Sequence, residues 1–334
     1  MKIVKRFRTA VVLSAISIIT GGWGFLVHKT VHQLAVYTLP KKMRPFFYQN
    51  MEYLVTNAPR PDMRRNQDST EATKHFIDLE MYGPEAINKM PLDWQSAIIL
   101  YSKDSLLKYG YVPYHVLYMK DKLTEAFTTG NKDSILFYAA DLGHYIGDAN
   151  VPLHTTVNYD GQLTNQKGLH SLWESVIPEI EIGNYSLYSR HKAVYLDHPD
   201  EAIWGAVRRA AALVPDMLEK EKEVSKGFTE AQKFRIQIRR GRESKSYTTE
   251  FAKAYAVALQ NTINEQLLHS ANLVADFWYT SWVDAGKPDL LAITAHWGRA
   301  DKKKFRKELK IVKANKLLEN NLLLSKKIET KEAE

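Results

Sequence analysis

The sequence predicts an all-α fold, and three of its features support this prediction. Beyond residue 23, apolar residues recur mainly at the three- and four-residue spacing of amphipathic helices. Runs that alternate β-branched and polar residues, as strands require, are few. Prolines fall between the periodic segments or at their starts, where proline does least harm to helical hydrogen bonding. We therefore expect helices at residues 25–38, 42–57, 92–109, 113–128, 132–149, 167–176, 200–224, 228–240 and 247–284.

Two segments, residues 58–82 and 151–168, interrupt this helical pattern. The second contains the turn-forming string Asn158-Tyr159-Asp160-Gly161. Loops held by a rigid scaffold often carry functional residues. We therefore expect both segments to contribute to a site.

The length and composition fit one helical body with a tail. The chain has 334 residues, of which 45% are hydrophobic and 25% charged, as in ordinary soluble globular proteins. This composition argues against disorder and against a membrane bundle. We expect a single multi-helix domain at residues 23–300, followed by a basic C-terminal tail at residues 301–334 that forms a solvated amphipathic helix.

Residues 1–22 have the layout of a cleavable signal peptide. A basic start precedes an apolar run of about 12 residues, which ends at Gly21 and Gly22. An uncleaved membrane anchor is the alternative, but a spanning helix needs about 20 apolar residues. We therefore expect a secreted or periplasmic protein. The chain has no cysteine, so core packing or bound metal must replace disulfides as a source of stability.

The net charge of +8 would suit a nucleic-acid-binding protein, but its distribution argues against that interpretation. Four basic residues lie within residues 1–22, and residues 302–334 carry a surplus of six. The intervening body therefore has a net charge of about −2 and is not a basic platform in bulk.

The strongest chemical signal is a repeated pair of a histidine and a carboxylate. His144 and Asp148 are four residues apart, so on a helix they project from one face and can reach one ion. His170 and Glu174 repeat this spacing, and His154 lies between the two pairs. One such pair alone is more typical of a surface ion pair or a core histidine. Their combination within 31 residues favours a metal site.

Two further candidates lie in the first irregular segment. His75 stands beside an aromatic residue in the string His75-Phe76-Ile77-Asp78, and Asp62 precedes it by thirteen residues. Each has a structural alternative, because Asp62 could cap a helix or turn and His75 could be a surface residue. Their interpretation depends on the family.

These motifs resemble the superfamily of bacterial zinc-dependent phospholipases C and fungal and plant single-strand nucleases of the S-one/P-one type. The resemblance covers about residues 23–175 with specific motifs, and the helices to about residue 290 more loosely. In that family the mature chain begins with a tryptophan whose α-amine and carbonyl bind zinc. Here Trp23 directly follows the expected cleavage point, which supports both inferences.

The resemblance implies three Zn²⁺ ions in a cleft between helices. It assigns one ion to Asp62, His75, His144 and Asp148, a second to Trp23, His28 and the bridging Asp148, and the third to His154, His170 and Glu174. His32 shares a helix face with His28 and is the alternative ligand. We prefer His28 because its distance from Trp23 matches the nuclease branch.

The implied activity is zinc-dependent hydrolysis of a phosphate ester bond. Zinc polarises a phosphoryl oxygen and activates water, and Asp62 would orient or deprotonate that water. The resemblance allows two substrates. In the nuclease branch Phe76 stacks on a base and Asp78 hydrogen-bonds it, although ordinary packing would also explain Phe76. The Glu174 ligand, the short step from His154 to His170 and the absence of cysteine are more similar to the phospholipase branch.

We favour a phospholipase C-like phosphodiesterase because the body is near neutral, and keep a single-strand-specific nuclease as the alternative. The expected partner is a phosphodiester substrate, either a phospholipid or single-stranded nucleic acid. Transient membrane contact fits the first, and no obligate protein partner is expected. A third hypothesis is a non-catalytic binding protein in which zinc only organises helices. The presence of Asp62, which such a site would not require, argues against it.

Overall fold

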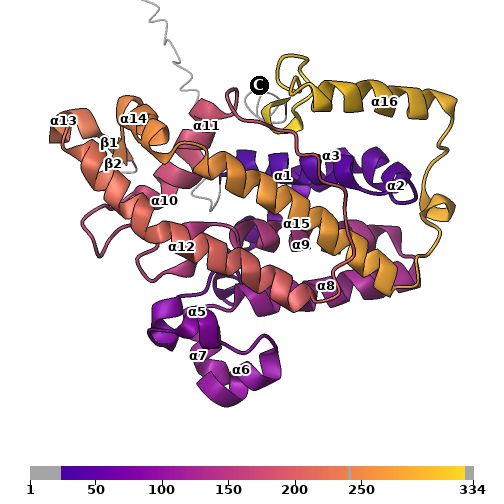
Figure 1. Ribbon diagram of the computed structural model, residues 1–334, viewed down its shortest axis with the longest axis horizontal. Coiled ribbons are helices and arrows are strands. Elements are labelled where there is room, and N and C mark those ends of the chain that lie inside the picture. Colours follow the sequence, from indigo (N-terminus) through magenta and orange to yellow (C-terminus); the bar gives the residue numbers. More distant parts are fainter. Residues whose placement is uncertain (1–23, 240–241, 328–334) are drawn as a thin grey trace, which may run out of the picture.

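The computed structural model describes residues 24–239 and 242–327, and nearly all of its regular structure is helical (Figure 1). The expected signal peptide and Trp23 lie outside the described residues. The all-α prediction is confirmed. Among the described helices, none is both long enough and apolar enough to cross a membrane.

The first half of the chain combines three longer helices with several short ones. They are α1 (Phe25–Thr38), α2 (Arg44–Gln49), α3 (Met51–Asn57), α4 (Arg60–Arg64), η1 (Ala72–Lys74), η2 (Leu79–Tyr82), α5 (Ala86–Lys89), α6 (Trp94–Tyr101), α7 (Lys103–Tyr109), α8 (Val112–Thr129), α9 (Lys132–Asp148) and η3 (Pro152–Thr155).

The second half contains the two longest helices and a small hairpin. Its elements are α10 (Leu169–Ser171), the π-helical turn η4 (Leu172–Val176), α11 (Ile177–Glu181), α12 (Pro199–Ser225), α13 (Glu230–Lys233), β1 (Phe234–Arg239), β2 (Arg242–Tyr247), α14 (Thr249–Leu259), α15 (Thr262–Asp284), η5 (Leu290–Ile293) and α16 (Arg299–Lys313).

One expected helix was wrong. Residues 228–240 form only the short helix α13 before the chain turns into β1, which pairs antiparallel with β2. The apolar residues Phe234, Ile236 and Ile238 alternate with polar ones, so the local period is two rather than 3.6. Three other expected helices are interrupted: residues 42–57 form α2 and α3, residues 92–109 form α6 and α7, and residues 247–284 form α14 and α15.

Helix α1 lies at the centre of the molecule and positions the site. Every residue from Leu26 to Tyr37 is buried, because α3, α9 and α15 all pack on this helix (Figure 1). Helices α8 and α12 extend the same core, which encloses the fully buried side chains of Trp173, Trp204 and Trp278. A helix covered on all sides needs partners for its polar residues.

The C-terminal residues supply some of those partners. Gln33 on α1 donates from Nε2 to the carbonyl oxygen of Leu322 at 2.8 Å, and its Oε1 accepts from the amide of Leu324 at 2.8 Å. The Tyr37 hydroxyl donates to Oε1 of Glu308 on α16 at 2.5 Å. Of the region expected to form a tail, residues 301–327 are described, and they dock on α1 while α16 exposes its lysines.

Candidate metal centre

The structure brings eight of the nine residues expected to bind metal into one cluster. They come from separate elements: His28 from α1, Asp62 from α4, His75 from the turn after η1, His144 and Asp148 from α9, His154 from η3, His170 from α10, and Glu174 from η4. All except His170 are buried, and its side chain is 22% exposed. The cluster therefore opens to solvent beside His170.

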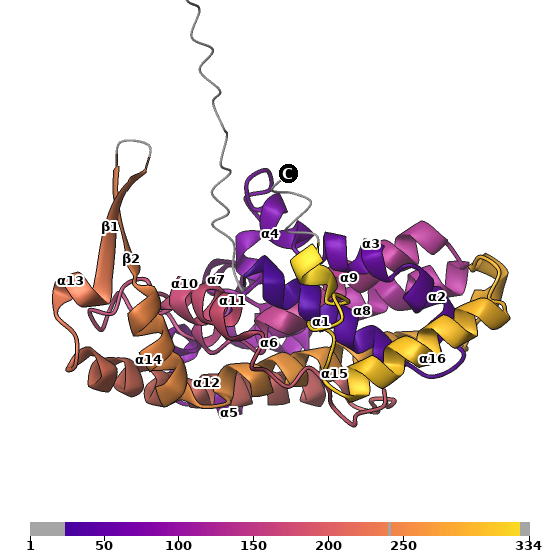
Figure 2. The same cartoon turned by 90° about the horizontal axis from the view of Figure 1, so that it is seen from above.

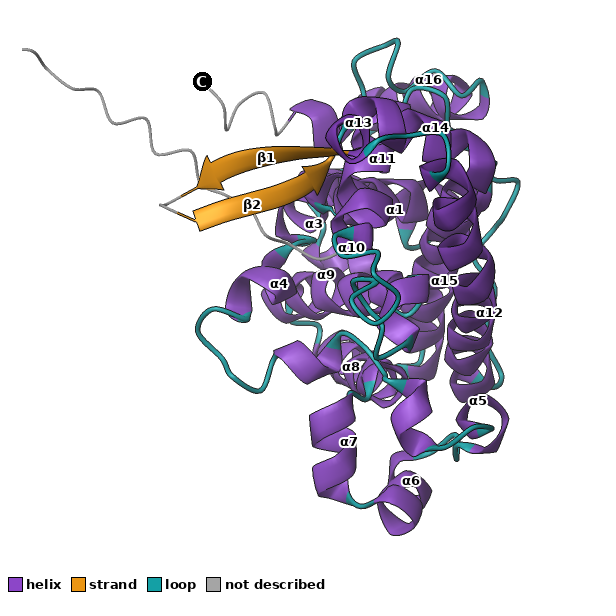
Figure 3. Ribbon diagram, turned by 90° about the vertical axis from the view of Figure 1, so that its left-hand side faces the viewer, coloured by secondary structure: helices purple, strands orange, loops and turns teal. Residues whose placement is uncertain are grey.

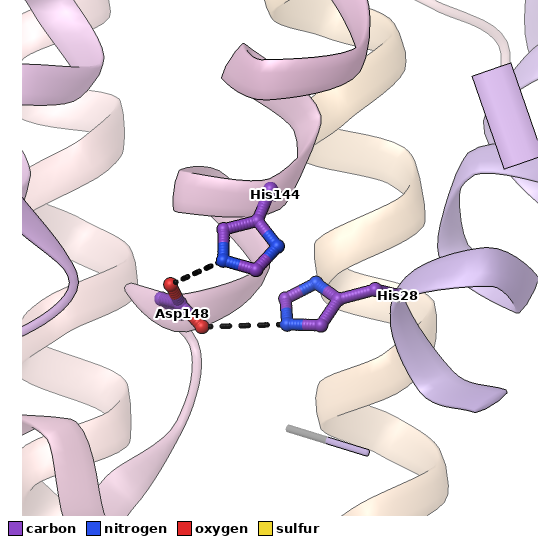
Figure 4. Close-up of side chains that lie close together, drawn as sticks. All are labelled: His28, His144 and Asp148. Atoms are coloured by element: carbon purple, nitrogen blue, oxygen red, sulfur yellow. Dashed lines mark ion pairs between the residues drawn. The ribbon is translucent and has the colours of Figure 1, made fainter. Parts of the chain in front are cut away.

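Asp148 is the centre of this cluster. Its Oδ1 lies 3.4 Å from Nε2 of His28, and its Oδ2 lies 3.2 Å from Nε2 of His144 (Figure 4). His144 and Asp148 share one face of α9 because they are four residues apart. The other two neighbours of Asp148 are His75, at 2.8 Å, and His154, at 3.5 Å. One carboxylate thus faces four histidines.

A second group forms around His75. Its Nδ1 lies 3.1 Å from Nε2 of His144 and 3.6 Å from Oδ1 of Asp62. Four ligands arranged tetrahedrally around zinc, at the usual bond length, would be roughly 3.3 Å from one another. The separations within this group therefore suit a central cation.

His154, His170 and Glu174 form the third group. The two oxygens of Glu174 face Nε2 of His154 at 3.2 Å and Nε2 of His170 at 3.0 Å. Glu174 lies in the π-helical turn η4, a kind of local distortion that is frequent at functional sites.

Backbone carbonyl groups orient three of the histidine rings. Nδ1 of His144 lies 2.9 Å from the carbonyl oxygen of Ala58, and Nδ1 of His154 lies 2.8 Å from that of His75. Nδ1 of His170 is 3.1 Å from the carbonyl oxygen of Tyr159. Donation from these Nδ1 atoms leaves each Nε2 free of a proton and directed into the cluster, as metal-binding histidines require.

Glu71 lies on the side of the His75 ring that faces away from the cluster and orients this ring. Our sequence analysis did not identify Glu71. Its Oε1 lies 3.5 Å from Nε2 of His75, which leaves Nδ1 to face the cluster. Arg64, Lys74 and the Tyr145 hydroxyl all contact this buried carboxylate. Glu71 lies four residues before His75, and that spacing was the signal that could have identified it.

Asp141 fixes the position of α4, and therefore of Asp62. Arg60 donates from Nε to Oδ1 of Asp141 at 3.0 Å, and Arg64 donates from Nη1 to its Oδ2 at 2.7 Å. Next to these, Arg65 places Nη1 3.5 Å from Oδ1 of Asp62, while its side chain stays 40% exposed. Sequence analysis missed all four of these contributors.

The electrostatic balance favours a bound cation. Burial would keep the carboxyl group of Glu174 neutral, yet His170 and His154 lower its pKa to about 2. Burial likewise opposes ionisation of Asp148, but His144 and His154 hold its pKa well below the usual range. Both carboxylates are therefore ionised at neutral pH. A buried negative charge requires a positive charge beside it, which is supplied either by protonated histidines or by a metal ion that neutral histidines bind.

The donor set passes a simple test of fit to zinc. Buried Oδ2 of Asp62, Oδ1 of Asp148 and both oxygens of Glu174 accept no hydrogen bond from the described residues. Imidazole nitrogens and carboxylate oxygens are the ligands that zinc takes in catalytic sites. The cluster thus offers unsatisfied acceptors of the right chemistry.

The structure places His28, and not His32, in the cluster. Both ring nitrogens of His32 lie against backbone carbonyl oxygens, Nδ1 at 2.7 Å from that of His28 and Nε2 at 2.9 Å from that of Ala140. Gly143 allows this approach, since a Cβ atom there would lie 2.4 Å from Nε2. Burial lowers the pKa of His32 to about 4, so the ring is neutral and structural.

The two residues expected to bind substrate lie beside the cluster. Phe76 directly follows His75, is half-buried, and packs against Gly110, where a Cβ atom would lie 2.6 Å from its ring. Burial and the nearby Glu80 raise the pKa of Asp78 to about 6. The amide of Ile77, between them, donates to the carbonyl oxygen of His154 at 2.9 Å. This hydrogen bond holds the segment of Phe76 and Asp78 next to the cluster.

The described chain begins next to Glu174. The amide of Gly24 donates to the carbonyl oxygen of Glu174 at 2.9 Å. Gly24 has little room there, because a Cβ atom would lie 2.8 Å from the hydroxyl oxygen of Ser175. The residue that precedes Gly24 in the sequence is Trp23, which lies outside the described residues.

Comparisons with known proteins bear on this arrangement. No family model matches the chain. Nuclease S1 of Aspergillus oryzae is 28% identical over 191 residues, a match that covers 52% of this chain and 60% of that protein. The chain therefore aligns with less than two thirds of the length of this relative.

Solved structures of two clostridial toxins show a weaker likeness. The alpha-toxin of an avian strain of Clostridium perfringens has a TM-score of 0.49 at 15% identity and covers 80% of this chain and 65% of the toxin. The alpha toxin of Clostridium absonum has a TM-score of 0.46 at 15% identity and covers 81% and 65%. The similarity to nuclease S1 supports the nuclease side of the resemblance that the motifs carry.

Proposed function

We propose that this protein is a zinc-dependent hydrolase of phosphate ester bonds. One observation carries the proposal: three groups of side chains that could hold a metal ion adjoin one another, and histidines from all three face the buried carboxylate of Asp148. A structural zinc site normally has four ligands that enclose one ion. Eight clustered residues with a solvent opening beside His170 fit a catalytic site better than a structural one.

In this proposal the ligands of the three ions are those expected from the sequence. Asp148 would bridge two ions, one held with Asp62, His75 and His144 and the other with His28 and Trp23. The position of Gly24, bonded to Glu174, supports a ligand from the adjacent Trp23. That ligand requires a free α-amine, so we also propose that residues 1–22 are removed during export.

Different residues of the chain would bind the metal, activate the water and bind the substrate phosphate during hydrolysis. Zinc, when bound, supplies Lewis acidity toward a phosphoryl oxygen and lowers the pKa of water in the site. Asp62 keeps Oδ2 buried and without a hydrogen bond from the described residues, so this oxygen can orient a water molecule and accept its proton. The half-exposed guanidinium of Arg65 lies next to Asp62 and can bind a substrate phosphate.

Two substrate classes follow from the same site. The similarity to nuclease S1 and the position of Phe76 and Asp78 beside His75 favour single-stranded nucleic acid. The exposed apolar side chains of Met63, at 60%, and Tyr159, at 55%, are close in sequence to Asp62 and His154 and favour a phospholipid. We prefer the phospholipid and propose a phospholipase C-like phosphodiesterase.

The test combines metal content with hydrolysis of both substrates. Protein with a verified Trp23 N-terminus is analysed for zinc and then assayed on phospholipid vesicles and on single-stranded RNA and DNA. We expect close to three zinc ions per chain, and we expect Asp62→Ala to abolish hydrolysis. Asp121→Ala, at a carboxylate that is 75% exposed, is the matched control and should be fully active. Fewer than two zinc ions per chain, or an active Asp62→Ala variant, would refute the proposal.

A further inference from the structure

The β1–β2 hairpin projects from the helical body as an arm. Figures 2 and 3 show it extending from the same face as α4, which carries Asp62. An isolated hairpin has no core of its own and is only marginally stable in water, so a projecting one needs support at its base. That support comes from α12 and from the loop that leads into α10, the helix that carries His170.

Tyr247, at the end of β2, makes this connection. Its hydroxyl donates to Oε1 of Glu221 at 3.0 Å and lies 3.3 Å from the carbonyl oxygen of Gln166. Gly168 lies under the tyrosine ring, where a Cβ atom would sit 3.4 Å away. His170 follows only two residues later, so the arm is built directly onto the open side of the metal cluster.

The arm carries two isoleucines that nothing described in the structure covers. Ile236 is 67% exposed and Ile238 is 78% exposed. Both lie on β1 and are two residues apart, so they share one face of the strand. Exposed apolar residues on a strand are an aggregation hazard that soluble proteins usually avoid. Their retention on a projecting arm points to an apolar partner.

The positive charge of the arm indicates that its partner is negatively charged. Residues 235–245 contain five basic residues and one acidic residue. The register places Lys245 opposite Ile236, and its Nζ lies 3.8 Å from the centre of the Phe234 ring. Apolar side chains among cationic ones are typical of elements that lie in the headgroup region of anionic membranes.

Other exposed apolar side chains lie in the segments next to Asp62 and His170. Met63, next to Asp62, is 60% exposed. Tyr159, whose carbonyl orients His170, and Leu163, in the same loop, are 55% and 66% exposed. Together with the isoleucines they add exposed apolar surface to the segments that carry or adjoin Asp62 and His170.

We propose that the β1–β2 arm docks this face of the protein on an anionic lipid surface, with Ile236 and Ile238 entering the headgroup region. The inference rests on the proposed function, because docking in this orientation presents the metal cluster to phospholipid headgroups. Lipid fits better than nucleic acid, since isoleucine offers no ring for base stacking. Insertion of two isoleucine side chains removes their apolar surface from water.

The test separates docking from hydrolysis. Ile236→Ser/Ile238→Ser is compared with wild type by co-sedimentation with vesicles of phosphatidylcholine and phosphatidylglycerol. The matched control is Ile99→Ser/Leu291→Ser, at residues that are 86% and 53% exposed on α6 and η5. We expect the arm variant to bind vesicles about tenfold or more weakly and the control to bind normally. A second variant, Arg235→Gln/Lys245→Gln, removes two of the five basic residues and should show a weaker preference for anionic over neutral vesicles.

Hydrolysis of a short-chain phospholipid below its micelle concentration gives the second measurement. We expect the arm variant to retain wild-type activity there and to lose activity only on vesicles. Wild-type vesicle binding by the arm variant would refute the docking proposal, as would a selective loss of binding to single-stranded DNA. A wild-type protein that binds vesicles through the arm but hydrolyses no phosphodiester would refute the proposed function and leave docking standing.

Discussion

Glu174→Gln is the sharpest perturbation of the proposed third zinc site. Glu174 is fully buried, and its two oxygens face only His154, at 3.2 Å, and His170, at 3.0 Å. It contacts neither Asp148 nor His144 in the described structure. The substitution removes one negative charge and one anionic ligand while keeping nearly the same shape. We therefore expect loss of one ion and retention of the other two.

The size of the effect follows from the role of the carboxylate. Changing an outer partner of a zinc ligand usually weakens metal binding about 10- to 100-fold, so replacing a ligand should cost more than about 100-fold. That factor corresponds to roughly 2.7 kcal/mol of binding free energy. At saturating zinc the same amount is lost from the stability of the loaded protein. For a chain of this length, we expect the melting temperature to fall by roughly 5 °C.

The assay is zinc analysis after dialysis, with a melting curve at fixed free zinc. Wild-type protein should retain three ions and Glu174→Gln two. Glu223→Gln serves as the control, because Glu223 is 54% exposed and pairs with Lys226 on the surface. Three tightly bound ions in Glu174→Gln, or an equal loss in Glu223→Gln, would show that Glu174 holds no ion.

Two further predictions concern packing and protonation around the site. Gly143→Ala would place Cβ 2.4 Å from the buried His32 ring and should cost about 1–3 kcal/mol of folding free energy. Gly205→Ala is the control, because no heavy atom lies within 4 Å of the added Cβ, and it should be neutral or stabilising. Chemical denaturation of the two variants and wild type measures the difference. Burial and Glu80 raise the pKa of Asp78 to about 6, so its ionised form destabilises the folded state at higher pH. Asp78→Asn should therefore melt at a higher temperature than wild type above pH 6 and at the same temperature below about pH 4, and an equal gap at both pH values would contradict this reasoning.

The long helices were predictable from the sequence because their apolar spacing is continuous. Helix α1 begins and ends where expected, and α8, α9 and α12 differ from expectation by one or two residues. The interruptions carried no local signal of glycine or proline. The residue that follows each helix has a positive φ, 66° at Ser102 after α6 and 54° at Gln260 after α14, although neither residue type favours the left-handed region.

The β1–β2 arm was missed for a different reason. Its alternation of apolar and polar residues covers only residues 234–239, and the flanking sequence has helical character. A short amphipathic strand and a short helix are hard to separate by periodicity alone. The arm also projects from the body, so neither of its faces is packed against a core. A strand with one buried face usually has a clearer alternation of apolar and polar residues.

The candidate site was more predictable than the elements that support it. Histidines and carboxylates at four-residue spacing are visible in the sequence, and the family resemblance added Asp62 and His75. Asp141, by contrast, acts through arginines some eighty residues away, at Arg60 and Arg64. Such a contact depends on how α4 packs on α9, which no local pattern encodes.

The docking of the C-terminal residues on α1 has a consequence for protein synthesis. His28 is among the first residues made, yet its helix acquires its last neighbours only when Leu322 and Leu324 reach Gln33. A chain that lacks them loses two of the hydrogen bonds of the buried Gln33 amide and keeps the one to the Tyr37 hydroxyl, at a cost of about 1–3 kcal/mol for each unsatisfied group. The helix that carries His28 therefore depends on contacts with residues about 290 positions later in the sequence.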